Sequence, residues 1–421
     1  MKTTQLHAWH TGHGANMAVF GEYDMPMWYG AGAKAEHLAV LTAAGLFDTS
    51  HMAVVLVQGT GAFDLLQAAF TGNLAGCVSP SKAPLSPVRC VYGAFLDDKG
   101  HVIDDAIIFQ VSSGHYMIVV NAGMGADIAA HLASQADVPE TIRITDMTDQ
   151  LGKIDIQGPA AAKILSRVLV DPETVFQKLP YFAFKGYFEP AAESTQTVRL
   201  QNGAAVLVSR TGYTGEFGFE LFVAAGEAVT LWNDLLAAGE SFGIVPCGLA
   251  ARDSLRAGAV LPLSHQDIGP WPFRNNPWPF ALPWDTGQTA FTKSFRGSRA
   301  LLEAGDVDYT RPFAGFDLRK VANPAETVVV DDAGRPLGTV LTCATDMGIG
   351  RHQDRIFSLV SPDKPEGFKA KGLCCGFVKV SADLPAGTLI YLQDKRRKLK
   401  AMIVDDIRPD RTARRPLNDM L

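Results

Sequence analysis

Residues 101–109 read HVIDDAIIF, and they place two acids inside an otherwise apolar strand. Successive side chains of a strand point to opposite faces, so Asp104 and Asp105 are expected on different faces. Both faces are otherwise apolar, which is typical of a strand covered on both sides. The stretch therefore predicts a strand that lies in the interior of a layered fold.

A carboxylate inside such a strand needs hydrogen-bond donors or a cationic ligand, because burial alone disfavours its ionised form. One interpretation is that one of the two acids is a functional group held by donors of this kind. The other is that both acids cap the turn Asp97–Gly100, which precedes the strand. The two-residue period of a strand does not indicate whether Asp104 or Asp105 is the functional acid.

Outward from this stretch, strands and helices alternate irregularly, which indicates an α+β fold rather than a doubly wound sheet. The strands expected in the N-terminal part are Val54–Val57, Asp104–Val111, Tyr116–Val120, Lys153–Ile156, Ala204–Val208 and Phe217–Val223. Helical spacing of apolar residues predicts a helix at 226–239, and Gly158-Pro159, with a proline suited to a first helical turn, predicts another at 159–169. After the Pro/Trp-rich passage 270–284 and the charged stretch 303–311, short strands with turn signals predict a C-terminal all-β domain.

The composition indicates a folded protein whose main partner is not nucleic acid. Hydrophobic residues make up 47% of the 421 residues, enough for a sizeable core, which excludes general disorder. Lys and Arg number 38 against 44 Asp and Glu, a formal net charge of −6, whereas nucleic-acid-binding proteins usually carry a basic surplus. The length predicts about two or three domains.

The sequence also predicts a cytoplasmic chain without a metal site. No apolar run approaches the ~18 residues of a membrane-spanning helix, and the N-terminus MKTTQLHAWHTGHGAN lacks the apolar stretch of a signal peptide. The six cysteines are expected as free thiols, with no CxxC pair for zinc. His10 and His13 have an HxxH spacing but no carboxylate partner, which favours ordinary loop polarity over a ligand pair.

Two further stretches combine residues that are able to bind a ligand. RTGYTGEFGFELFV (210–223) has three glycines that allow a hairpin turn or a close approach to a ligand, but it is neither a dinucleotide fingerprint nor a P-loop. GLAARDSLR (248–256) places Arg252 and Arg256 four residues apart on an expected helix, where like charges repel unless an anion joins them. A carboxylate such as Glu220 or an anionic ligand would join them; two solvated arginines are the alternative.

The order of the motifs is more specific than any one of them. They are EHLAVLTAAGLFDTSHM (36–52), YGAFLDDKGHVIDDAII (92–108), VVNA (119–122), IQGPAA (156–161), RTGYTGEFGFE (210–220) and CGLAARDSLRAG (247–258). Together they resemble the aminomethyltransferase family, the T-proteins of the glycine cleavage system, colinearly over roughly residues 7–300. The resemblance implies three domains in a cloverleaf around a central tetrahydrofolate. The folate-binding α+β core is expected to be discontinuous and to comprise residues 1–55 and 150–300. Residues 56–149 would form a second α+β domain that carries the catalytic acid. Residues 310–421 would form a β-barrel-like domain.

Carried over position by position, the resemblance implies a set of site residues. The family's catalytic aspartate, the first acid of its VIDD motif, falls on Asp104. Folate-lining positions fall on Met52, Tyr92, Asn121, Tyr213, Glu220, Arg252 and Trp284. The carboxylate of Glu220 would accept two N–H groups of the pterin, with Arg252 orienting it. Tyr92 and Met52 would supply flat, polarisable walls.

The implied reaction moves a one-carbon unit from an aminomethyl group on the lipoyl arm of the H-protein to tetrahydrofolate, and it releases ammonia. Tetrahydrofolate is then the acceptor and the lipoylated H-protein the partner, while metal, nucleic acid and membrane take no part. Asp104 would hold the attacking nitrogen and stabilise the cationic one-carbon fragment. The sequence holds no GxSxG or HExxH motif, consistent with a reaction that needs no covalent enzyme intermediate.

The chain departs from the family pattern after LPLSHQDI (261–268). The next residues, GPWPFRNNPWPFALPW, contain Trp271, Trp278 and Trp284, the last of them aligned with a family tryptophan near the folate. One interpretation is a packed loop at a domain junction. The other is an aromatic cage for a methylated ammonium or sulfonium compound, which would make the protein a tetrahydrofolate-dependent demethylase. We expect packing and an aminomethyl donor.

Two stretches bear on other functions. A branch of the superfamily that serves iron–sulfur assembly, without known transferase chemistry, is marked by a Lys-Gly-Cys-Tyr motif, whereas residues 293–297 read KSFRG, which disfavours that non-catalytic function. The basic stretches KRRKLK (395–400) and RPDRTARR (408–415) are interpreted as solvated faces. Alternatively they steer an acidic carrier protein or the polyglutamate tail of folate.

Overall fold

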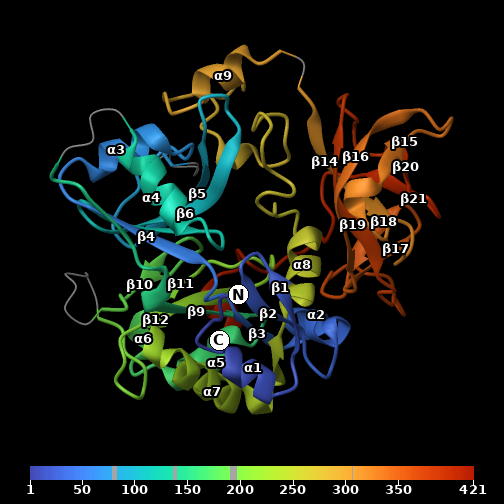
Figure 1. Cartoon of the computed structure of the whole chain (residues 1–421). Helices are drawn as coiled ribbons and strands as arrows, with labels where there is room; N and C mark the ends of the chain where they lie inside the picture. The colour runs from blue at the N-terminus through green and yellow to red at the C-terminus, as the bar shows by residue number, and fades with distance from the viewer. Residues whose placement is uncertain (78–82, 136–139, 190–196, 306) are drawn as a thin grey trace.

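The computed structural model describes residues 1–77, 83–135, 140–189, 197–305 and 307–421. Figure 1 shows three lobes, two of them mixed from helices and strands and the third built of strands. The α+β class with a C-terminal all-β domain, predicted from the sequence, is confirmed. The exact division into domains at the residues given above stays a prediction.

The first lobe, at the bottom of Figure 1, is a mixed sheet with helices packed on one face. Its strands, in spatial order, are β10 (Phe184–Lys185), β11 (Leu207–Ser209), β12 (Gly218–Ala224), β9 (Leu151–Gln157), β3 (Ala44–Asp48) and β13 (Ile244–Cys247). Only β3 and β13 run parallel among these neighbours. The helices around it are α1 (His7–Gly12), α5 (Ala161–Val168), α6 (Pro172–Phe176) and α7 (Ala228–Gly239). The apolar stripe of α7 buries Trp232 completely against the sheet.

The second lobe is an antiparallel sheet that carries the VIDD motif. Its strands, in spatial order, are β5 (Arg89–Leu96), β6 (Val102–Ser112), β7 (His115–Val120), β4 (Ala53–Gln58) and β8 (Arg143–Asp146). Helices α3 (Ala62–Ala69) and α4 (Gly125–Ala133) cover one face, and the opposite face packs Phe109 against Phe184 and Phe222 of the first lobe. Strand β6 is therefore covered on both sides, as its sequence predicts.

The third lobe is a closed barrel. Its strands, in order around the barrel, are β14 (Tyr309–Gly315), β19 (Leu373–Val380), β16 (Pro336–Asp346), β15 (Val328–Val330), β20 (Leu389–Gln393) and β21 (Lys398–Ile403). A hairpin of β17 (Ile349–His352) and β18 (Arg355–Ser358) extends from it, and α9 (Ser298–Glu303) precedes it in the chain. The charged boundary predicted at 303–311 overlaps the start of β14, where the buried Thr310 lies between the partly exposed Tyr309 and Arg311.

Three elements join the lobes near the middle of the molecule (Figure 1). They are the hairpin β1 (Asn16–Phe20) with β2 (Tyr23–Trp28), α2 (Ala33–Thr42) and α8 (Leu249–Gly258). Helix α8 contacts α2 and β2 on one side and the barrel strands β16 and β19 on the other. Helix α8 thereby holds the first lobe against the barrel. No helix of the described residues has the length and apolar character needed to cross a membrane.

The chain after the barrel returns to the first lobe, and this overturns part of the expectation for the basic stretches. Arg408 is completely buried, donates to Glu216 over 3.1 Å and forms an ion pair with Asp346. RPDRTARR is therefore not simply a solvated face, because its first arginine joins the barrel to the β11–β12 loop. The residues of KRRKLK, by contrast, are exposed apart from Leu399.

The glycines of RTGYTGEFGFE allow the chain to approach itself closely. A Cβ on Gly218 would lie 2.4 Å from the carbonyl oxygen of Ile156, and one on Gly212 would lie 2.3 Å from the side chain of Gln157. Strands β11 and β12 pair as the predicted hairpin. The glycines at 212 and 218 therefore serve packing against β9, rather than an approach to a ligand.

Candidate active site

A β-bulge precedes the two acids of β6. Phe95 of β5 lies opposite Asp104 and Leu96 lies opposite Val102, so one extra residue is inserted in β6. Bulges of this kind change the direction of side chains at the end of a ladder. The Asp104 side chain is completely buried.

Burial alternates between Asp104 and Asp105 along β6, as expected for neighbouring strand residues, yet one side chain contacts both carboxylates. The Nδ2 atom of Asn121 donates to Asp104 Oδ1 over 2.8 Å and to Asp105 Oδ1 over 2.7 Å. Because β7 ends at Val120, Asn121 lies beyond the last rung of the ladder and reaches both carboxylates. The two acids therefore share one donor and one electrostatic environment.

Asp104 has the donors that a buried carboxylate requires. Its Oδ2 accepts the backbone N–H of Asn121 over 2.8 Å, and its Oδ1 accepts the hydroxyl of Ser264 over 2.7 Å. Burial raises the pKa of Asp104 to about 7, the negative charge of Asp105 adds to this shift, and the donors partly oppose it. A carboxylate with a pKa near neutrality is able to take up and return a proton. The capping alternative fails, because Asp97 closes the preceding turn with its own carboxylate.

Asp105 is held by Tyr92 of the neighbouring strand. The Tyr92 hydroxyl donates to Asp105 Oδ2 over 2.8 Å. Burial raises the pKa of Tyr92 well above its usual value, and the adjacent charge of Asp105 raises it further. Tyr92 is therefore a fixed neutral donor, and its ring packs 5.8 Å from that of Phe280.

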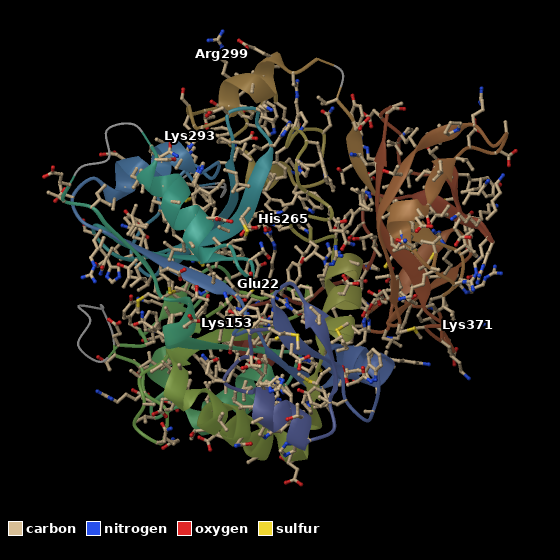
Figure 2. The ribbon with its side chains drawn as sticks, viewed as in Figure 1. Glu22, Lys153, His265, Lys293, Arg299 and Lys371 are labelled. Carbon is tan, nitrogen blue, oxygen red and sulfur yellow. The ribbon has the colours of Figure 1, made fainter. Side chains whose placement is uncertain are left out.

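A turn after α8 contributes two residues that sequence reasoning missed. Ser264 donates to Asp104, and His265 Nε2 lies 3.6 Å from the same carboxylate oxygen. The turn is fixed by Asp267, which is fully buried in an ion pair with Arg256. Nothing in the spacing of LPLSHQDI indicates that this turn reaches β6, because the contact spans more than 150 residues of sequence. In Figure 2, His265 lies in the middle of the view, where the lobes meet.

Glu220 lies in a second buried polar cluster, on β12 and β9. Lys153 Nζ donates to Glu220 Oε1 over 2.6 Å and to Asp155 Oδ1 over 2.6 Å. The hydroxyl of Thr211 donates to Glu220 Oε2. Lys153, Asp155 and Glu220 are each no more than 6% exposed. One buried cation is thus shared by two carboxylates.

The predicted pairing of Arg252 with Glu220 is wrong. Lys153 occupies that role, because β9 and β12 are neighbours and Glu220 lies directly across from Asp155. Arg256 is paired with Asp253 and Asp267, so Glu220 does not relieve the like-charge repulsion on α8 either. A signal for Lys153 was present, since a lysine and an aspartate at alternate positions of an apolar strand require partners.

Tyr213, in the loop between β11 and β12, contacts α8 and the turn that follows it. The guanidinium of Arg252 lies 4.5 Å from the centre of its ring, and its hydroxyl donates to the carbonyl of Pro262. Burial raises the pKa of Tyr213, with Arg256 and Arg252 opposing the shift and Asp105 favouring it. Tyr213 is therefore held by Arg252 of α8 and by the backbone of the turn after α8.

The remaining predicted residues lie at the edges of this region. Met52 is partly buried against the core between the first two lobes, and Trp284 packs 4.3 Å from Phe291 in the cluster that also includes Tyr92. His51, which precedes Met52, is buried, and its Nδ1 has no partner among the described residues. Burial lowers the pKa of His51 to about 3, and the charge of Arg252 adds to the shift. His51 is therefore a neutral, buried polar group next to Met52, with its Nδ1 unpartnered among the described residues.

The tryptophans of the 270–284 passage face three different neighbours. Trp278 is completely buried and donates its indole N–H to the carbonyl of Val260 over 2.8 Å. Trp271 lies under the ammonium of Lys379, 4.5 Å from the ring centre. Trp284 packs on Phe291 as described above. Rings with separate partners do not form a common cage, which favours the packing interpretation.

Comparisons with known proteins point to one family. The family model described as the GCVT N-terminal domain matches residues 6–272. An aminomethyltransferase of Geobacillus thermodenitrificans is 34% identical over 412 residues, which cover 96% of this chain and 97% of that protein. One of Prosthecochloris aestuarii is 34% identical over 405 residues, covering 96% and 98%. The crystal structure of glycine cleavage system aminomethyltransferase T from Bartonella henselae superposes with a TM-score of 0.74 at 26% identity, covering 96% of both chains.

Proposed function

The chain belongs to the GCVT aminomethyltransferase family, and from this premise we propose that it transfers a one-carbon unit from an aminomethyl group to tetrahydrofolate and releases ammonia. The observation that carries the proposal is Asp104, a completely buried carboxylate held by two donor residues with a pKa raised to about 7. Such a group is suited to proton transfer and to stabilising a developing positive charge.

The second polar cluster, around Glu220, has unused capacity to accept hydrogen bonds from a pterin. Each oxygen of Glu220 accepts one donor from the protein, Lys153 or Thr211, and a carboxylate oxygen has capacity for a second. His51 Nδ1 is a buried polar atom without a partner among the described residues. We propose that Glu220 accepts pterin N–H groups, while Tyr92 packs against the aromatic part. Tetrahydrofolate, when bound, supplies the nitrogen that accepts the one-carbon unit.

The other predicted positions have supporting roles in this proposal. Arg252 holds the ring of Tyr213, and Asn121 holds Asp104 and Asp105 together. Met52 and Trp284 supply apolar surface next to these groups. Asp104 would accept a proton from the acceptor nitrogen and return one to the leaving amine.

We further propose that the donor is the aminomethyl-lipoyl arm of the H-protein and that the reaction takes place in the cytoplasm. The structure from Bartonella henselae is that of a glycine cleavage system protein, and its likeness covers nearly the whole chain. The separate partners of Trp271 and Trp278 argue against the alternative donor, a small methylated amine or sulfonium compound.

The donor is tested by supplying the purified protein with tetrahydrofolate and either aminomethylated lipoyl H-protein or a panel of methylated amines and sulfonium compounds. We expect ammonia from the carrier, dependent on tetrahydrofolate, and no methyl transfer from the panel. H-protein without the aminomethyl group is the control. Methylation of folate by a small donor, with no ammonia from the carrier, would replace the proposed function with demethylation.

Substitution of the tryptophans separates packing from donor recognition. Trp278→Leu is expected to destabilise the protein by about 2–4 kcal/mol, because a completely buried ring and its hydrogen bond are lost. Trp271→Leu should cost about 0.5–2 kcal/mol through its contact with Lys379. Denaturant unfolding measures both losses. The ratio of rates with the carrier and with small donors should stay unchanged; a selective change in that ratio would indicate a cage.

A further inference from the structure

A histidine in an unusual backbone conformation stands beside Asp104. His265 has a φ of +61°, in the left-handed region that residues other than glycine seldom adopt. Its Nε2 lies 3.6 Å from Asp104 Oδ1, and its side chain is 51% exposed while that of Asp104 is fully buried. The pair therefore has one member in contact with solvent and one in the interior.

The turn is held on both sides of His265. The preceding residue, Ser264, donates to Asp104 over 2.7 Å. Two residues after His265, Asp267 is fully buried and paired with Arg256 of α8. Because both flanks are fixed, the strained conformation is imposed by the fold, and it keeps the imidazole next to the carboxylate.

The other titratable groups near Asp104 are poorly suited to exchange protons with solvent. Asp105 on β6 is bonded to Tyr92 of β5, and burial raises the pKa of both groups. Tyr213 of the β11–β12 loop also has a raised pKa. Among the described residues, His265 is the titratable group beside Asp104 whose side chain is half-exposed to solvent, and an imidazole is the kind of side chain that shuttles protons at physiological pH.

We propose that His265 is the group through which Asp104 exchanges its proton with solvent during turnover. Asp104 takes a proton from the acceptor nitrogen, passes it to Nε2 of His265, and the imidazolium releases the proton on Nδ1 to water; the reverse path supplies a proton. Only O–H and N–H bonds form and break, and no electrons are transferred. The 3.6 Å separation shortens to a hydrogen bond with a small rotation of the ring, as catalytic pairs often do when substrate binds. The inference rests on the proposed function.

Two substitutions at this position test the relay without disturbing the backbone. Glycine adopts a positive φ freely and asparagine tolerates it, so His265→Gly and His265→Asn both preserve the turn. We expect kcat for ammonia release to fall about 10–100-fold in each, with the KM for tetrahydrofolate changed less than about twofold. Added imidazole should restore the rate of His265→Gly. His352→Asn, on the exposed end of β17, is the matched control and should behave as wild type.

Two kinetic results would overturn the relay. One is a wild-type kcat in both variants; the other is a loss that imidazole does not restore. The relay is also tested without turnover, by titrating the Asp104 carboxyl with carbon-13 NMR. The pH at the midpoint of this titration should rise in His265→Gly, because a neighbouring imidazolium is lost. An unchanged midpoint would also overturn it. Absence of ammonia release by the wild type would instead refute the proposed function, and the NMR titration would then decide about His265.

Discussion

Asp104→Asn is expected to reduce turnover by about a hundredfold or more while leaving tetrahydrofolate affinity within a few-fold of wild type. The substitution keeps the size and most contacts of the side chain but removes the charge that takes up a proton, and general acid–base catalysis typically contributes about 10²–10⁴ in rate. Single-turnover ammonia release gives the rate, and a binding titration gives the affinity. Loss of affinity that accounts for the whole defect would mean that Asp104 binds folate rather than acting in the reaction.

Asp105→Asn is the matched control for this prediction. Because the ionised form of Asp104 is required, the wild-type rate should rise with pH and reach half its maximum near pH 7. The charge of Asp105 raises the pKa of Asp104, so its removal should move that midpoint to lower pH and reduce the maximal rate much less. A pH–rate profile of the two enzymes measures the shift. Equal losses in the Asp104 and Asp105 variants would show that the catalytic acid is wrongly assigned.

Lys153→Met is expected to destabilise the protein by about 3–5 kcal/mol, because it leaves Glu220 and Asp155 buried without their shared cation. Glu220→Gln should weaken tetrahydrofolate binding about tenfold, since a charge-assisted hydrogen bond becomes a neutral one. The double variant should be less destabilised than the sum of the single variants, because each substitution removes the other's partner. Denaturant unfolding measures the first and third effects.

Arg252→Gln provides the comparison for this cycle. Arg252 contacts Tyr213 and not Glu220 in the described structure, so its effect on stability should add to that of Glu220→Gln. The opposite result would be strictly additive stability losses for Lys153 and Glu220, together with non-additive losses for Arg252 and Glu220. That result would mean that Arg252, and not Lys153, pairs with Glu220, as the motifs led us to expect.

The elements that local sequence patterns predict correctly are those whose burial is uniform along the chain. Strand β6 and helix α7 are recognisable because their apolar periods match their environment over many residues. The order of the motifs additionally indicates the family and identifies Asp104, rather than Asp105, as the expected catalytic acid. Within the ladder, however, the bulge before Asp104 depends on the partner strand β5, which periodicity in β6 alone does not encode.

The residues that the sequence did not indicate are those that cross between lobes. Ser264 reaches Asp104 from a turn fixed by Asp267, and that turn is held in place by Arg256 and the barrel. Similarly, the identity of the residue that pairs with Glu220 depends on which strand lies next to β12. Both contacts join residues that are far apart in sequence. The spacing of residues along the chain therefore does not predict either contact.

The most direct test of the central claim follows the transferred carbon itself. Aminomethylated lipoyl H-protein labelled with carbon-13 in the aminomethyl group is mixed with the enzyme and tetrahydrofolate, and the fate of the label is observed by NMR during one turnover. We expect the label on folate together with one equivalent of ammonia in the wild type, and retention of the label on the carrier with Asp104→Asn. Transfer at an undiminished rate by Asp104→Asn, or a label that never leaves the carrier in the wild type, would contradict the mechanism.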